Sequence, residues 1–142
     1  MSRNVALVVL DTVRKDYFDD NAPRIRRRAG TSFEQCRAAS SWSVPSHTSI
    51  FTGRLPSDHG VHAESFDANF DFAAFAGDTV MDDLDGWRAV GLSANSYVNS
   101  HFGADALFDA FHDFSIGSHT AESLFTEGKT VDEYMHRTDE PS

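Results

Sequence analysis

The feature that most constrains the fold is a continuous apolar run near the start of the chain, Val5-Ala6-Leu7-Val8-Val9-Leu10. It has no polar residue on either face and is rich in β-branched side chains. This pattern is typical of a strand that is covered on both faces, as in a parallel sheet. The run stops at Asp11, so we expect that residue to lie just beyond the carboxyl end of the strand.

Signals for helices and strands alternate along the rest of the chain. We predict helices over 22–29, 46–52 and 78–84, strands over 31–38 and 87–93, a polar loop over 40–46, and at least one helical turn over 131–136. The first helix has Pro23 in its first turn and Gly30 just past its end. Strand–helix–strand order favours an α/β fold, a layered sheet with flanking helices.

The charge balance limits the classes of partner that the chain can bind. The chain has 22 Asp and Glu against 12 Lys and Arg, a net charge of −10, and its only lysines are Lys15 and Lys129. Such a surface suits a high-salt cytoplasm, where ions screen the self-repulsion, although an ordinary acidic protein is the alternative. It argues against nucleic acid and anionic membranes. The arginine run 24–28 is expected to coat a helix rather than bind a polyanion.

Membrane and redox signals are weak. No apolar stretch approaches the roughly 18 residues of a membrane span, and the run at 5–10 is too short for a signal-peptide core. We therefore expect a cytoplasmic protein. The single cysteine, Cys36, excludes an internal disulfide and is expected to be a small core residue of a strand.

Two groups of residues have the chemistry of a site. Asp11, after a strand, can hold a hard divalent cation, although a turn or cap role is more common. Ser43 stands just before a predicted helix, whose free N–H groups and dipole suit a sulfate or phosphate and would assist a nucleophile. From spacing alone, a helix cap with nothing bound is the better interpretation of Ser43.

A resemblance changes that balance. The stretch Ser43-Val44-Pro45-Ser46-His47-Thr48-Ser49-Ile50-Phe51-Thr52-Gly53 is similar to the sulfatase signature Cys/Ser-x-Pro-Ser-Arg-x-x-x-Leu-Thr-Gly. Further matches lie at 8–16, 54–56, 59–61, 86–95, 102–103 and 108–111. Together they cover about residues 4–114, which resemble the N-terminal portion of a sulfatase of the alkaline phosphatase superfamily. Residues 1–142 are then one partial catalytic domain, in which 115–142 form a polar tail.

The resemblance implies a metal-dependent hydrolase of small-molecule sulfate or phosphate esters on a mixed α/β sheet. Ser43 falls on the family nucleophile, and Asp11 falls on its early metal aspartate. We therefore expect Ser43 and His47 to be catalytic, and Asp11 and Ser43 to bind a divalent cation, Ca²⁺ or Mg²⁺. His47 itself has two open interpretations, an anion contact or an exposed helix residue.

The chain departs from the sulfatase pattern at several positions. Thr12 replaces a second aspartate, and Ser93-Ala94 replaces a Gly-Lys pair. His47 replaces the arginine used in formylglycine formation, so Ser43 is expected to remain a serine.

The second metal pair of the family usually lies past residue 142, and Asp58-His59 is interpreted as structural. The chain is thus expected to be truncated and incomplete by itself, with a second chain as one way to complete the site. The alternatives are a non-catalytic remnant or interaction module that retains the half-fold, and a generic acidic α/β binding domain.

Overall fold

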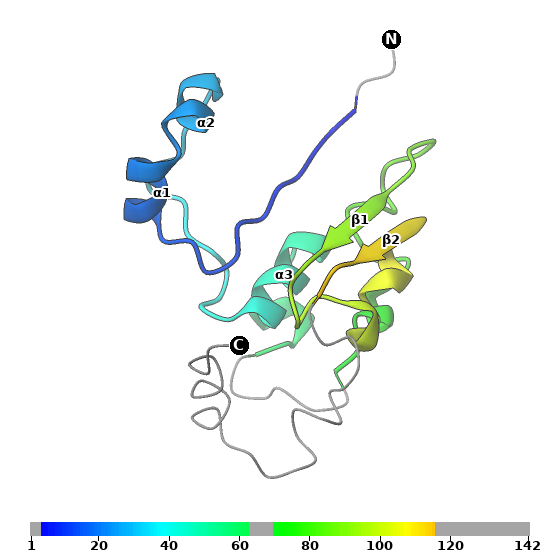
Figure 1. The fold of residues 1–142 in the computed structure, drawn as a ribbon. Helices are drawn as coiled ribbons and strands as arrows, with labels where there is room; N and C mark the ends of the chain where they lie inside the picture. Colours follow the sequence, from blue (N-terminus) through cyan, green and yellow to red (C-terminus); the bar gives the residue numbers. More distant parts are fainter. Residues whose placement is uncertain (1–3, 63–69, 116–142) are drawn as a thin grey trace, which may run out of the picture. The chain divides into compact units, whose positions relative to one another are not determined.

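The structure is a computed structural model that describes residues 4–62 and 70–115. The chain divides into two compact units, Met1–Ala39 and Ser40–Ser142, and each is described by itself. The first unit contains the helices α1 (Lys15–Asn21) and α2 (Pro23–Arg28) (Figure 1). The second unit contains the helices α3 (Ser43–Thr52) and α4 (Pro56–His59) and the strands β1 (Val90–Ser93) and β2 (Ala110–Asp113). It also contains the short 3₁₀ helices η2 (Phe72–Phe75), η3 (Ser100–Phe102) and η4 (Ala104–Leu107). In the described ranges, no helix has the length and apolar character needed to cross a membrane.

The apolar run Val5–Leu10 does not form the predicted strand. It is extended, but Val5 is 76% exposed and Leu7 is 70% exposed. An extended segment becomes a strand only when a neighbouring backbone pairs with it, and no strand lies in the described part of residues 1–39. Apolar character alone therefore misled the prediction.

The two helices of the first unit had different outcomes. α2 confirms the helix predicted over 22–29, with Pro23 in its first turn and the Ala29 N–H bonded to the Ile25 carbonyl at 3.1 Å. α1 was not predicted; an ion pair from Lys15 to Asp19, one turn apart, supports it.

The strand predicted over 31–38 is wrong. The Cys36 N–H bonds the Phe33 carbonyl at 3.2 Å and closes a turn instead. Cys36 is exposed, which also corrects its expected place in the core.

The second unit contains a two-stranded parallel sheet. β1 pairs with β2 from Val90 opposite Ala110 to Ser93 opposite Asp113. β1 confirms the last four residues of the strand predicted over 87–93, while β2 was not predicted. Parallel pairing across an intervening segment of short helices makes this a mixed α/β arrangement, which agrees with the predicted fold class at that level.

The core of the second unit is built on α3 and the short helices. Its buried apolar residues are Val44, Phe51, Phe72, Val98, Phe102, Ala104 and Leu107. Phe51 meets Phe72 and Phe108 edge to face, with ring centroids 5.7 and 5.8 Å apart. α3 is therefore fixed by its own apolar face.

The end of α3 joins it to the next segment. Gly53 ends the helix at φ +67°, and the Val80 N–H bonds the Phe51 carbonyl at 2.7 Å. The helix predicted over 78–84 is wrong, because this segment consists of turns. The Asp82 carboxylate accepts from the Thr79 N–H and hydroxyl, as at a helix start, but the aspartates and Gly86 that follow are poor helix formers. The helix predicted over 131–136 lies outside the described residues.

Candidate active site

α3 begins at Ser43, three residues before the predicted start. Ser43 is the first helical residue and is half-buried, and Trp42 before it is extended, with no side-chain cap. The first-turn N–H groups of a helix have no partner within the helix. Pro45 has no N–H, and the Ser46 N–H bonds the Trp42 carbonyl at 3.2 Å. Ser43 and Val44 supply the other N–H groups of this first turn.

Residues on the core side of the first turn set the position of Ser43. Val44 is 0% exposed, and Pro45 is among the most deeply buried side chains. Proline is tolerated in the first turn because its missing N–H is not needed there. The two buried side chains anchor the helix start and leave the Ser43 side chain at the boundary between core and solvent.

His47 is bound to Ser43 through the backbone. Its Nδ1 lies 2.8 Å from the Ser43 carbonyl oxygen. A carbonyl can only accept, so Nδ1 carries the hydrogen, and Nε2 of the neutral ring keeps a lone pair. His47 is only 7% exposed, and its ring lies near that of Phe51, with 6.1 Å between centroids. The interpretation of His47 as an exposed helix residue is therefore wrong.

His59 connects the loop after α4 to α3. Its Nδ1 accepts from the Val61 N–H at 3.1 Å, so its Nε2 carries the hydrogen and donates to the Ser49 hydroxyl at 2.9 Å. Burial, and then the neighbouring His62, lower the pKa of His59. With this tautomer Nε2 cannot take a proton from Ser49, so the pair is not a nucleophile and base. The contacts agree with the structural interpretation of Asp58-His59.

Asp11 lies in an exposed turn rather than at a strand end. The Val13 N–H reaches the Leu10 carbonyl at 3.4 Å, and the Thr12 hydroxyl donates to the Asp11 carboxylate at 3.2 Å. Thr12 has φ +63°, which is uncommon for a β-branched residue. Asp11 belongs to the unit Met1–Ala39 and Ser43 to the other unit, so their proximity stays a prediction.

The expected metal site is only partly supported by the donors at hand. Carboxylate and hydroxyl oxygens, as on Asp11 and Ser43, suit Ca²⁺ or Mg²⁺. Within residues 4–62 and 70–115, however, no group of three His, Cys, Asp or Glu side chains is placed to hold an ion. Two ligands are too few for cations that take about six to eight. The donors fit in kind but not in number.

One prominent carboxylate was missed by sequence reasoning. Asp113, at the carboxyl end of β2, accepts from the Ser115 N–H and hydroxyl at 2.9 and 2.6 Å and from the Ser100 N–H at 3.1 Å. Burial acts to raise its pKa, but these hydrogen bonds outweigh burial and the pKa lies below its ordinary value. All three bonds tie β2 to its neighbours, so the role of Asp113 is structural. A prediction of β2 was needed to find it.

An α/β unit that presents a serine at a helix start is a suitable framework for ester chemistry. The model of the type I phosphodiesterase / nucleotide pyrophosphatase family matches residues 5–137, and the chain belongs to that family. These are phosphoester hydrolases of the alkaline phosphatase superfamily, typically dependent on divalent metals. The match confirms the superfamily predicted from the motifs; it does not support the sulfatase branch. No match was found among curated proteins or among solved structures.

Proposed function

We propose that this chain carries the nucleophile of a metal-dependent hydrolase of small-molecule phosphate esters, and that the nucleophile is Ser43. The observation that supports this most is the position of Ser43 as the first residue of α3, within a chain whose family match spans residues 5–137. Sulfate esters are the second candidate substrate, favoured by the signature-like stretch Ser43–Gly53.

The chemistry follows from the helix start. The Ser43 hydroxyl oxygen loses its proton to solvent and attacks phosphorus. Its bond to phosphorus forms as the bond to the alcohol oxygen breaks, and the leaving oxygen takes a proton from solvent and departs as the alcohol. Water then cleaves the phosphoserine and returns the hydroxyl with release of phosphate. The positive end of the helix dipole at the start of α3 favours the negative oxygens of the transferring group.

His47 is the second residue of the proposed site. Its Nδ1–H holds the Ser43 carbonyl and so fixes the first turn of α3. The Nε2 lone pair leaves it able to accept a hydrogen bond from a protonated ester or a water. Because His47 stands where the sulfatase signature has arginine, we expect Ser43 to act as an unmodified serine.

The proposed metal ligands in this chain are Asp11 and Ser43, which requires the two side chains to lie within about 12 Å of each other, the reach of a shared metal–ester site. A bound Ca²⁺ or Mg²⁺ would offset charge on the ester oxygens. The other ligands must come from outside the described residues or from a second chain. This shortage is the observation that favours the alternative, a non-catalytic module that keeps the fold.

The test measures turnover of 4-nitrophenyl phosphate, bis(4-nitrophenyl) phosphate and 4-nitrophenyl sulfate with Ca²⁺, Mg²⁺ or Mn²⁺ in high KCl. Because two ligands are too few, the 142-residue chain alone should be no faster than its Ser43→Ala variant. Protein purified under native conditions from its host, with any completing chain bound, should show metal-dependent turnover of a phosphate ester. Ser43→Ala should reduce this by at least about 10³-fold, since it removes the covalent step.

Ser46→Ala is the matched control, because Ser46 is also half-buried in the first turn of α3. It should retain most of the turnover. Equal loss in both variants would assign the effect to the helix rather than to Ser43. Turnover that persists in Ser43→Ala would refute the assignment, and no turnover in either preparation would favour the non-catalytic module.

A further inference from the structure

Charge is divided unequally between the two units. Residues 1–39 contain eight Lys and Arg against five Asp and Glu, a net charge of +3, whereas residues 40–142 contain four against seventeen, a net charge of −13. Most of the basic residues of an acidic chain are thus concentrated in its first quarter. Such an uneven charge distribution indicates which partners the chain can bind and does not bear on the fold.

Within the first unit the unpaired charge is concentrated on α2. Arg24, Arg27 and Arg28 are spaced three and four residues apart, so they share one face of the helix. All three are exposed, and none has an ion pair among the described residues. By contrast, Lys15 pairs with Asp19 and Glu34, and Arg26 pairs with Asp19. Like charges at this spacing repel one another, so the face is stabilised by an acidic partner.

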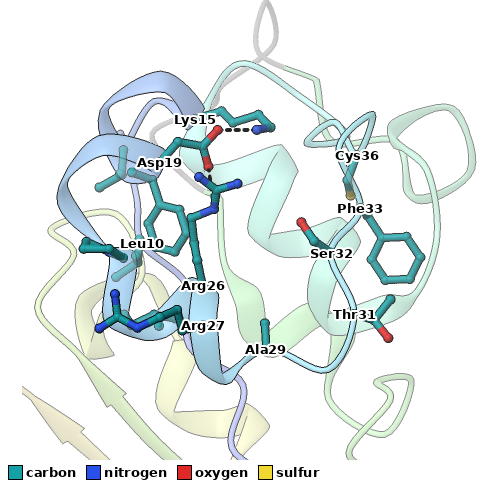
Figure 2. Close-up of a pocket in the computed structure, with 14 residues that line it drawn as sticks. Leu10, Lys15, Asp19, Arg26, Arg27, Ala29, Thr31, Ser32, Phe33 and Cys36 are labelled. Atoms are coloured by element: carbon teal, nitrogen blue, oxygen red, sulfur yellow. Dashed lines mark hydrogen bonds and ion pairs between the residues drawn. The ribbon is translucent and has the colours of Figure 1, made fainter.

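Beside this arginine face lies a hollow of about 720 Å³ that is lined by both apolar and charged side chains. Its wall includes Leu10, Val13, Phe18, Ile25 and Phe33, with Arg27 also lining it. Figure 2 shows Lys15, Asp19 and Arg26 joined by their contacts, while Arg27 points away from them. Ile25 and Phe33 are 59% and 77% exposed. Arginine next to aromatic and aliphatic side chains is the composition of a protein-binding surface.

We propose that the arginine face of α2 and the adjoining hollow dock on the acidic unit of a second copy of this chain. The attraction is local, because it sets the basic face of one copy against a unit of net charge −13 in the other, and it must exceed the repulsion between two copies of total charge −10. Eight of the nine aspartates in the described part of residues 40–142 are exposed, so this unit has an acidic surface. A second copy of the chain supplies that surface at the same concentration as the arginine face. In a two-fold dimer the arginine face of each copy contacts the acidic unit of the other, so the same contact forms twice. This inference does not depend on the proposed hydrolase activity.

The experiment is sedimentation equilibrium of the 142-residue chain from about 1 to about 100 μM, the range in which a weak dimer dissociates. The triple variant R24Q/R27Q/R28Q is compared with R14Q/R37Q/R88Q, which changes the net charge equally at exposed arginines outside α2. The α2 variant should raise the dimer dissociation constant at least about tenfold, and the matched control less than about twofold. R24K/R27K/R28K, which keeps the charge, should dimerise nearly as well as the parent chain.

A salt series adds a readout that needs no variant. The dissociation constant should rise between about 0.1 M and about 1 M KCl, as the screening length falls from about 10 to about 3 Å. Circular dichroism establishes that each sample is folded. A parent chain that stays monomeric at every concentration overturns the proposal, as does equal weakening by both glutamine triples. A dimer unaffected by the α2 substitutions places the interface elsewhere and overturns it too.

Discussion

Replacement of Gly103 by alanine should destabilise the second unit more than the same change at Gly86, a turn glycine whose added Cβ would meet no neighbouring atom. Gly103 has φ +69°, and a Cβ built on it would lie 1.8 Å from the Asp71 carboxylate and 3.1 Å from the Ala73 nitrogen. The Asp71 side chain must therefore move. That movement breaks its hydrogen bond of 2.8 Å from the Ala73 N–H, which caps η2 directly before the fully buried Phe72.

Two costs add in this variant. A left-handed backbone costs a residue with a Cβ roughly 1–2 kcal/mol, and loss of a cap costs about 1 kcal/mol. Gly103→Ala should thus lower the free energy of unfolding by about 2–3 kcal/mol. Gly86→Ala is the matched control, because Gly86 has φ +74° but nothing within 4 Å of the added Cβ. It should lose only the backbone cost.

Urea unfolding followed by circular dichroism, in KCl, measures both variants. A double-mutant cycle with Asp71→Ala separates the two costs: once the carboxylate is gone, Gly103→Ala should cost about 1 kcal/mol less than in the parent chain. If Gly103→Ala were no more destabilising than Gly86→Ala, or if the cycle were additive, the clash with Asp71 would not be the cause and the argument would fail.

Three further predictions concern pH, modification and salt. The lowered pKa of His59 means that folding favours the neutral ring, so the contribution of His59 to stability is complete above the ordinary pKa of 6.5 and is lost as pH falls below it. The urea midpoint of the parent chain should therefore drop from about pH 7.5 to about pH 5.5. This drop should be smaller in His59→Gln but unchanged in His101→Gln, where the histidine is exposed. Intact-mass analysis of protein from its native host should show Ser43 as serine; a loss of two hydrogens localised there would show that His47 does not block formylglycine formation. The melting temperature should rise from about 0.1 M to about 2 M KCl as salt screens the net charge of −10, and a flat or falling series would contradict the high-salt origin.

Local rules predicted the helices better than the strands. α2 was predicted from Pro23 in its first turn and Gly30 beyond its end, because these signals act within one or two turns. The helix predicted over 46–52 is α3 with a late start, because Pro45 lies within the first turn of α3 rather than before the helix. The helix predicted over 78–84 failed for the opposite reason, since a good start signal at Thr79 and Asp82 was followed by residues that do not continue a helix.

Strands depend on partners that a sequence pattern does not specify. Val5–Leu10 has the strongest strand composition in the chain, yet it has no pairing neighbour in the described part of its unit. β2 has weaker composition and was missed, but it pairs with β1 over four residues across the intervening segment. Pairing between distant segments is set by packing of the whole unit, and so composition ranked these two segments in the wrong order.

In the candidate site, too, local contacts could be predicted from the sequence and contacts between distant segments could not. Ser43 and His47 are one helical turn apart, so their contact was implicit in the spacing once the helix was placed to include Ser43. Asp11 was linked to Ser43 by the family resemblance alone, and no local rule joins residues in two separate units. The buried side of His47 was not foreseen, because burial depends on what packs on the helix rather than on the helix itself.

The structural roles of the motif residues determine how Ser43→Ala can be interpreted. Val44 and Phe51 fill the core, Gly53 ends α3, and His59 ties α3 to the following loop, so a motif match at these positions would persist in a module that had lost catalysis. The bond from His47 reaches the backbone carbonyl of Ser43, which alanine retains. A Ser43→Ala variant that unfolds at the parent's urea midpoint but loses turnover would therefore assign the hydroxyl to chemistry. Equal losses in stability and turnover would assign it to the fold.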